Sequence, residues 1–295
     1  MPTYDFVTLD VFTDRPFGGN PLAVFPDARG LTDAQMQSLA AEWNLSETTF
    51  VLPPSDPANT ARVRIFNRTA EMPFAGHPNV GTGFVLAGLG RGQGDVLRFE
   101  EIAGLVEVRV ARDGSGGLTG AVIDAPRALV TGPQLTAAQA GACVGLAASD
   151  FVTASHPPVQ ASLGIDFFFA EVTADALGRS GPDLAGFRKT AAETDTGSDR
   201  LSLFLYVRDG QKLRARMFAP LSGTFEDAAT GSASATVGAL LLSLSADAEG
   251  RYEITQGVEM GRPSQLNVTA RRAPDGVRAS VGGSCAPMFR GTVEL

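Results

Sequence analysis

The sequence predicts a two-lobed α+β protein, and three observations support this prediction. The chain has 295 residues, which suits two domains of about 150 residues better than a single core. Strand-like alternation and short apolar helix patterns follow one another along the whole chain. A strand–loop–helix segment of the first half also returns in the second half at a nearly constant offset.

Composition and charge exclude several classes of protein. Apolar residues make up 44% of the chain and charged residues 19%, which is a globular balance. The net charge is -8 and the basic residues are dispersed, whereas nucleic-acid binding needs a basic face. No segment approaches the roughly 20 apolar residues of a membrane span, and the N-terminus lacks a signal-peptide pattern. We therefore expect a cytoplasmic protein without nucleic-acid or membrane partners.

The first half reads as strands interrupted by two helices. A capping box, Thr32 with Gln35, predicts a helix that runs to about Trp43. An apolar pattern that includes Gly83 predicts a second helix from Pro78 to Leu89. Alternating or apolar runs predict strands over residues 4–12, in LAVFP, in NLSETTFVLPP, and over residues 62–66, 96–99 and 105–110.

A proline- and glycine-containing stretch after about Ala125 predicts the crossover between the lobes. We place the N-terminal lobe at residues 1–125 and the C-terminal lobe at 126–283, with the option that the last strand, about 284–295, returns to the first lobe. In the second half we expect strands near Leu201–Val207 and Lys212–Phe218, a helix over about Ala233–Leu244, and a variable surface stretch over Asp175–Asp199.

An internal echo supports a duplicated architecture. The strand RVRIF at residues 62–66 has a counterpart, RARMF, at residues 214–218. Each is followed by a turn that carries a glycine, Gly76 or Gly231, and then by a small-residue apolar helix. A second glycine pair, Gly83 and Gly238, keeps the same spacing as the first. We infer a duplication in which loop insertions absorb the remaining difference.

Two helices that are each entered through a glycine suggest an anion site. Free backbone N–H groups and the positive end of the helix dipole favour an anion such as a small carboxylate. The alternative is that both glycines only relieve crowding, and this chemistry alone does not separate the two interpretations. The anion site is favoured by three polar residues near the helix starts: His77, Asp227 and Ser232. Each of these residue types is, however, also common at helix ends. Glu47 is an acid in an otherwise apolar strand, which makes it a further candidate for a functional role. The alternative is that its side chain occupies the solvated face of the strand.

Five stretches, taken together, resemble the PhzF family of phenazine biosynthesis-like proteins. They are DVFTDRPFGGNPLAVF, NLSETTFVLPP, AEMPFAGHPNVGTGFVLAG, FEDAATGSASATVGALL and QGVEMGRPSQL, and they span nearly the whole chain. The resemblance implies a diaminopimelate-epimerase-like fold, in which each lobe wraps a curved mixed β-sheet around a central helix. It also implies an active site between the lobes, a homodimer and no cofactor.

The resemblance assigns candidate site residues. The family's catalytic glutamate corresponds to Glu47, its histidine to His77, and its aspartate and serine to Asp227 and Ser232. We expect the substrate to be bound by the residues Asn20, Gly76, Thr230 and Gly231. The sequence EDAATGSA departs from the family's common EDPATGSA, because Ala228 replaces a proline, and this is expected to loosen the loop slightly.

The sequence has no motif for thiol-based racemisation, nucleotide binding, serine-nucleophile catalysis or metal binding. Racemases of this fold use a cysteine at the start of each central helix, but Cys143 and Cys285 lie elsewhere. The chain has no phosphate loop, no dinucleotide fingerprint and no nucleophile elbow. The two histidines are not spaced as metal ligands, and His156 is expected to be an ordinary loop residue. We therefore expect neither a metal nor another cofactor.

The sequence thus predicts an isomerase of a small cyclic carboxylate, similar to trans-2,3-dihydro-3-hydroxyanthranilate isomerase. Glu47 would remove a proton from one carbon and return it to another, and an apolar surrounding would raise the pKa of its carboxyl. The main alternative is a non-catalytic small-molecule or protein-binding member of the same fold. An epimerase or racemase is a weaker alternative, since no thiol lies at the start of either helix.

Overall fold

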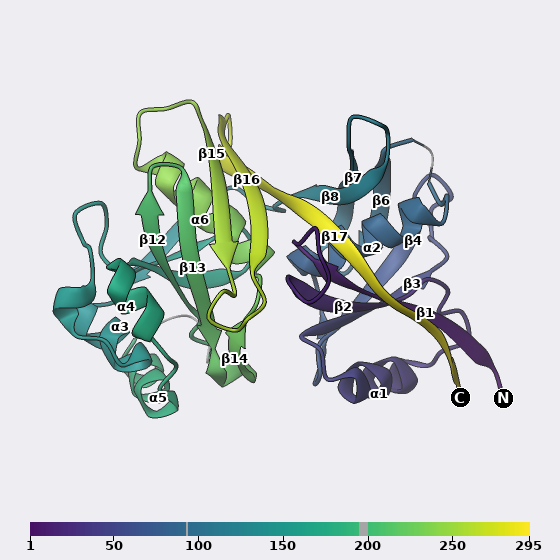
Figure 1. Ribbon diagram of the computed structural model, residues 1–295, viewed down its shortest axis with the longest axis horizontal. Coiled ribbons are helices and arrows are strands. Elements are labelled where there is room, and N and C mark those ends of the chain that lie inside the picture. Colours follow the sequence, from purple (N-terminus) through teal and green to yellow (C-terminus); the bar gives the residue numbers. More distant parts are fainter. Residues whose placement is uncertain (93, 195–199) are drawn as a thin grey trace. The chain divides into compact units, whose positions relative to one another are not determined.

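A computed structural model describes residues 1–92, 94–194 and 200–295 (Figure 1). The predicted α+β class is confirmed, with strands predominating over helices. The chain forms two compact units: unit 1 comprises Met1–Pro126 together with Val281–Leu295, and unit 2 comprises Arg127–Ser280. No helix in the described ranges has both the length and the apolar character needed to cross a membrane.

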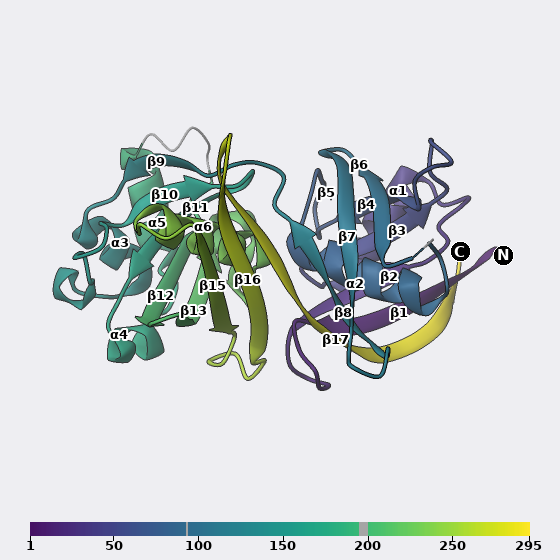
Figure 2. The same cartoon turned by 90° about the horizontal axis from the view of Figure 1, so that it is seen from above.

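The strands of unit 1 close on themselves. β1 (Thr3–Val11) pairs antiparallel with β2 (Asn20–Phe25) and with the C-terminal part of β17 (Gly276–Glu294). From β2 the pairing runs in parallel to β3, antiparallel to β4, in parallel to β6, and then antiparallel through β7 to β8. β8 pairs in turn with β17, which completes the circle (Figure 2). The bounds are Glu47–Leu52 for β3, Ala61–Phe66 for β4, Val96–Glu101 for β6, Gly104–Arg112 for β7 and Leu118–Asp124 for β8.

The helix α2 (Gly76–Gly88) packs against the inner side of this closed sheet and contacts β1, β2, β3, β7 and β8. Its residues are apolar or small on nearly every side, as expected for a helix surrounded by strands. Glycine is needed where the wall is closest, because a Cβ on Gly83 would lie 2.5 Å from Cγ1 of Val108. The helix α1 (Asp33–Trp43) packs on the sheet through an aromatic cluster, and both hydrogen bonds of its predicted capping box at Thr32 are present.

Unit 2 repeats the strand pairing of unit 1. β9 (Val130–Gln134) pairs antiparallel with β10, and β10 pairs antiparallel with β11. From β11 the pairing runs in parallel to β12 and then antiparallel to β13. It continues in parallel from β13 to β15 and ends antiparallel at β16. The parallel pairs β11–β12 and β13–β15 thus match β2–β3 and β4–β6. The central helix α6 (Gly231–Ser243) contacts β10, β15 and β16, and it has 13 residues, like α2. The other bounds are Val159–Ser162 for β10, Asp166–Glu171 for β11, Leu203–Asp209 for β12, Lys212–Ala219 for β13, Glu249–Gln256 for β15 and Ser264–Ala273 for β16.

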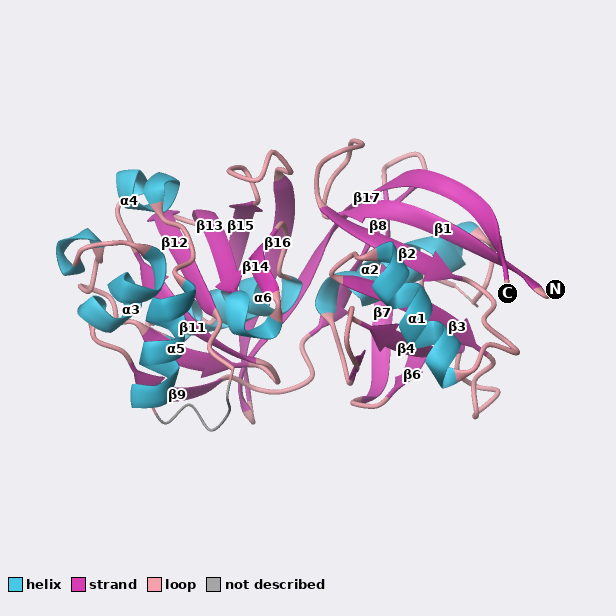
Figure 3. Cartoon of the chain, turned by 90° about the horizontal axis from the view of Figure 1, so that it is seen from below, coloured by secondary structure: helices cyan, strands magenta, loops and turns pink. Residues whose placement is uncertain are grey.

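Most described residues of the expected surface stretch over Asp175–Asp199 are exposed or half-buried, but the stretch is largely helical. It holds most of α4 (Ala174–Arg179) and all of α5 (Leu184–Glu193), which pack with α3 (Ala137–Val144) on the unit 2 sheet (Figure 3). A few well-spaced apolar residues, Leu177 and Phe187 among them, are fully buried there, and the polar residues between them hide this pattern. Residues 195–199 lie outside the described part of the chain.

Most other predicted elements are confirmed, with small shifts at their ends. Both central helices begin two residues earlier than expected, at Gly76 and Gly231, because the first turn needs no apolar residue. His156 is in a loop, as expected, but it is not an ordinary one. Its ring is buried, Nε2 lies 2.6 Å from Oη of Tyr206, and Nδ1 lies 2.7 Å from the carbonyl oxygen of Pro157.

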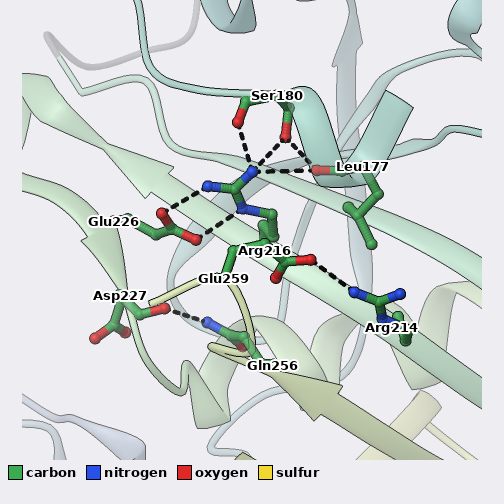
Figure 4. A network of polar contacts seen from close by, with 8 residues as sticks. All are labelled: Leu177, Ser180, Arg214, Arg216, Glu226, Asp227, Gln256 and Glu259. Atoms are coloured by element: carbon green, nitrogen blue, oxygen red, sulfur yellow. Dashed lines mark hydrogen bonds and ion pairs between the residues drawn. The ribbon is translucent and has the colours of Figure 1, made fainter. Parts of the chain in front are cut away.

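An arginine–glutamate pair anchors the loop that precedes each central helix. In unit 1, Arg64 on β4 donates from Nε and Nη2 to Glu71 at 2.7 and 2.6 Å. In unit 2, Arg216 on β13 donates from Nε and Nη2 to Glu226 at 2.8 and 2.8 Å (Figure 4). Glu71 lies on the two-residue strand β5 (Glu71–Met72), and Glu226 lies on β14 (Thr224–Asp227). These bidentate contacts fix the course of the chain just before α2 and α6.

The remaining guanidinium nitrogen of each arginine reaches a different helix. Nη1 of Arg64 donates to Asp33 on α1 at 2.5 Å, and Nη1 of Arg216 donates to the carbonyl oxygens of Leu177 and Ser180 at the end of α4. Each guanidinium also lies 5.0 Å from the centre of the phenylalanine ring two residues further along its strand. The repeated strand sequence therefore encodes a repeated set of contacts.

Gly238→Ala should destabilise the protein by about 1–3 kcal/mol, because overpacking a core position forces its neighbours to move. A Cβ at this position would lie 2.5 Å from Cγ1 of Val268 and 3.1 Å from Cδ2 of Tyr252. Urea unfolding measures the effect. Gly178→Ala is the matched control, since Gly178 is also helical and has open space around its Cβ direction. A Gly238→Ala variant as stable as the wild type would refute close packing of α6.

Arg216→Lys should cost about 1–3 kcal/mol of unfolding free energy, although it keeps the charge, because an ammonium cannot make the bidentate contact. The side chain of Arg216 is only 8% exposed. Arg214→Lys on the same strand is the control. Its side chain is 52% exposed and donates one bond to Glu259, so its loss should lie within about 0.5 kcal/mol. Equal losses in thermal unfolding of the two variants would contradict the anchoring role.

Candidate active site

Unit 1 brings Glu47 and His77 together at the start of its central helix. Glu47 is the first residue of β3, which runs parallel to β2 with Leu22 opposite Glu47. His77 is the second residue of α2. Nε2 of His77 lies 3.5 Å from Oε2 of Glu47, and the two side chains are 6% and 17% exposed. Only a small part of this carboxyl therefore remains accessible.

Burial determines the protonation state of His77. It lowers the pKa of the ring to about 3, so the imidazole is neutral near pH 7. Because the ring carries no charge, its contact with Glu47 is not an ion pair, even though the distance alone would fit one. Nε2 has no hydrogen-bond partner among the described atoms. A buried nitrogen without a partner, beside an acid, is a group that a bound ligand could satisfy.

Asn20 and Gly76 lie around the same pair. Asn20 begins β2, is 2% exposed, and accepts a 3.1 Å hydrogen bond at Oδ1 from the hydroxyl of Ser46, the residue before Glu47. Gly76 begins α2, and the preceding N-cap residue, Ala75, offers no side-chain cap. The N–H groups of the first turn are therefore not occupied by a capping side chain.

Unit 2 gathers the other four candidate residues at the start of α6. Asp227 ends β14, Thr230 is the N-cap of α6, and Gly231 and Ser232 are its first two residues. The hydroxyl of Thr230 donates to Oδ2 of Asp227 at 2.7 Å and does not cap the helix. Ser232 is half-buried. This arrangement again leaves the first turn of the helix without a capping side chain.

The sequence interpretation did not single out Gln256, which holds the start of α6 together. Gln256 ends β15 and is fully buried. Its Nε2 donates to the carbonyl oxygen of Asp227 at 2.8 Å (Figure 4). Nε2 also donates to the hydroxyl of Thr230 at 3.0 Å, and Oε1 accepts from the backbone N–H of Thr230 at 3.1 Å. Gln256 is the first residue of the stretch QGVEMGRPSQL, but nothing in that sequence distinguishes its structural role from that of the other polar residues there.

The replacement of proline by Ala228 leaves the loop well held. Ala228 is 4% exposed, and its carbonyl oxygen accepts a 2.8 Å hydrogen bond from the hydroxyl of Ser264 on β16. The expected loosening is therefore countered by a side-chain contact from a neighbouring strand.

Neither thiol lies on a central helix or on the residues that lead into one. Cys143 is on α3 and Cys285 is on β17; both are buried, and burial raises the pKa of each thiol. Such thiols are poor nucleophiles and poor bases near pH 7. Within residues 1–92, 94–194 and 200–295, no group of three or more His, Cys, Asp or Glu side chains could hold a metal ion.

Comparisons with known proteins agree on one family. The family model described as "Phenazine biosynthesis-like protein" (PhzC-PhzF) matches residues 9–291. The trans-2,3-dihydro-3-hydroxyanthranilate isomerase of Pseudomonas fluorescens is 35% identical over 99% of this chain and 100% of its own length. A PhzF-family phenazine biosynthesis protein of Bacillus anthracis shares the fold, with a TM-score of 0.87 at 24% identity over the full length of both chains. A predicted epimerase of Pseudomonas aeruginosa has a TM-score of 0.80 and 33% identity over 99% of both chains. This chain belongs to the PhzF family of phenazine biosynthesis-like proteins, and it is an isomerase.

Proposed function

We propose that the protein moves a proton within a small cyclic carboxylate, with Glu47 as the acid/base group and without a cofactor. The observation that carries this proposal is the contact between the Glu47 carboxyl and the buried, neutral His77 at the start of α2. The reaction resembles the one named for the relative from Pseudomonas fluorescens.

The proposed reaction has two proton transfers and no net change in composition. The carboxylate of Glu47 takes a proton from an allylic or α-type carbon, and the electrons of that C–H bond shift into the conjugated system. The carboxyl of Glu47 then returns the proton to another carbon of the same system. Because its pKa lies near 3, His77 stays neutral throughout and acts as a hydrogen-bonding group that orients the substrate rather than as a second base.

We propose that the start of each central helix binds substrate groups. In unit 1, the backbone N–H groups that follow Gly76 would bind a carboxylate beside Glu47 and His77, and Asn20 would hold the segment at Ser46 in place. In unit 2, the backbone N–H groups that follow Gly231 would bind an anionic or polar substrate group, because this first turn also lacks a capping side chain. Asp227 and Ser232 would bind and orient that group, and Thr230 would hold Asp227 in place. A homodimer and a cytoplasmic location remain part of the proposal.

Glu47→Gln should lower turnover by about 10²–10⁴-fold and leave folding intact, because the amide is isosteric but cannot accept the proton. The measurement is solvent deuterium incorporation into a panel of small unsaturated cyclic carboxylates, followed by mass spectrometry. Glu42→Gln, an exposed position on α1, is the matched control and should behave as the wild type. A loss smaller than about tenfold would remove Glu47 from the role of base, and binding without exchange in the wild type would favour a non-catalytic binding protein.

Cys143→Ala with Cys285→Ala should retain deuterium exchange at the wild-type rate, since both thiols are buried and neither lies on a central helix. A modest loss of stability is expected from the two small cavities, so exchange is compared at a temperature where circular dichroism shows the variant folded. Loss of exchange in the folded variant, or substrate-protected inactivation of the wild type by a thiol reagent, would instead indicate a racemase-type mechanism.

A further inference from the structure

Glu101 occupies the position in unit 1 that Gln256 occupies in unit 2. Glu101 ends β6, as Gln256 ends β15, and both strands run parallel to the strand that carries the anchoring arginine. The registers agree as well: on β4, Arg62 is opposite Glu100, and on β13, Arg214 is opposite Thr255. The duplication thus places a glutamate where the other unit uses an amide to hold the start of the central helix.

The surroundings of Glu101 suit a neutral group better than a charge. Both carboxyl oxygens are buried without a hydrogen-bond partner. The polar side chain that acts on this carboxyl is Asn79, in the first turns of α2, which is itself fully buried. Nδ2 of Asn79 donates to the carbonyl oxygen of Ala75 at 3.1 Å, which fixes the amide orientation and leaves Oδ1 without a partner. Asn79 therefore offers Glu101 the second hydrogen of Nδ2, which favours the charged carboxylate and lowers its pKa, and an acceptor at Oδ1. Only a protonated carboxyl can use both, because a carboxylate has no hydrogen to donate to Oδ1.

We propose that Glu101 is a neutral carboxylic acid in the folded protein and that its O–H donates to Oδ1 of Asn79, which makes Glu101 a positioning residue for the start of α2. One proton then joins Oδ1 of Asn79 to one of the two carboxyl oxygens of Glu101. Through Asn79, Glu101 holds the carbonyl oxygen of Ala75, directly before Gly76 and His77. Gln256 holds the N-cap residue Thr230 of α6 in the equivalent way. The turn after Glu101 adds a second tie, because the N–H of Ala103 donates to the carbonyl oxygen of Pro73 at 3.0 Å.

Electrostatics support the neutral form. Burial raises the pKa of Glu101 to about 8, against a smaller opposing effect of Asn79. The titratable groups on the elements packed against it have other partners or no charge. Glu100 on the same strand binds the loop at Ser55 to Asn59, Glu107 on β7 binds Arg98, Arg62 on β4 is exposed, and His77 on α2 is neutral.

The sign of the pH dependence follows from this shift. A carboxyl whose pKa is raised on folding stabilises the folded state at low pH, where it is protonated in both states. That stabilisation declines above the ordinary pKa of 4.5 and is lost once the pH rises through about 8. Above that pH, the charge on Glu101 should loosen the start of α2 and with it the position of His77.

The test is Glu101→Gln, which places in unit 1 the residue that unit 2 already has. Between pH 5 and 8 the unfolding equilibrium constant of the wild type should rise relative to that of Glu101→Gln, approaching about tenfold per pH unit. Glu100→Gln is the matched control. Its neighbours hold the pKa of the Glu100 carboxyl at about 2, so it should show no such rise in this range. Infrared difference spectra at pH 7 should show a neutral carboxylic acid in the wild type that is lost in Glu101→Gln.

Parallel unfolding curves for the wild type and Glu101→Gln, or no neutral acid signal, would overturn the proposal. So would failure of Glu101→Gln to fold, since a neutral amide should be tolerated at this position. Neither readout requires activity, so failure of the proposed function would leave this test intact. If the proposed function holds, deuterium exchange by the wild type should also fall above about pH 8, whereas exchange by Glu101→Gln should not.

Discussion

The bidentate arginine–glutamate pairs are the constraint on which the starts of both central helices depend. Arg64 with Glu71, and Arg216 with Glu226, connect a central strand to the loop that leads into the central helix. The same guanidinium groups reach α1 and α4, so one side chain joins three elements in each unit. An uncapped helix start that carries functional groups needs such support, because its free N–H groups do not hold the chain in place themselves.

Burial gives the starts of α2 and α6 different chemistry within the same architecture. In unit 1 it keeps the imidazole of His77 neutral beside the carboxyl of Glu47, and in unit 2 it surrounds a fully bonded amide, Gln256. In the proposed mechanism, a neutral histidine leaves proton transfer to the carboxyl of Glu47, so one acid would both remove and return the proton. Because neither helix begins with a cysteine, this site differs from a pair of thiols on opposite faces of a carbon.

Local patterns predicted much of the fold because they are determined by neighbouring residues. The capping box at Thr32 and the prolines after Leu52 act within a few residues, and the corresponding helix and strand ends lie where expected. The echo of RVRIF and RARMF indicated the duplicated units, but not what the arginines bind. Glu71, Glu226, Gln256 and Glu101 depend on contacts between distant segments, and α4 and α5 on a sparse apolar pattern. The spacing between Gly76 and Gly231 also separates Glu101 from Gln256, and it is the signal in the sequence for this pair.

The central claim is that the start of α2, with Glu47 beside the neutral His77, is where the proposed proton transfer takes place. Its most direct test is a crystal structure of the protein with a small cyclic carboxylate bound. We expect the ligand carboxylate to accept hydrogen bonds from backbone N–H groups in the first turn of α2, with Glu47 within reach of a ring carbon. A ligand whose ring lies far from Glu47, or whose carboxylate lies away from the first turn of α2, would contradict the claim.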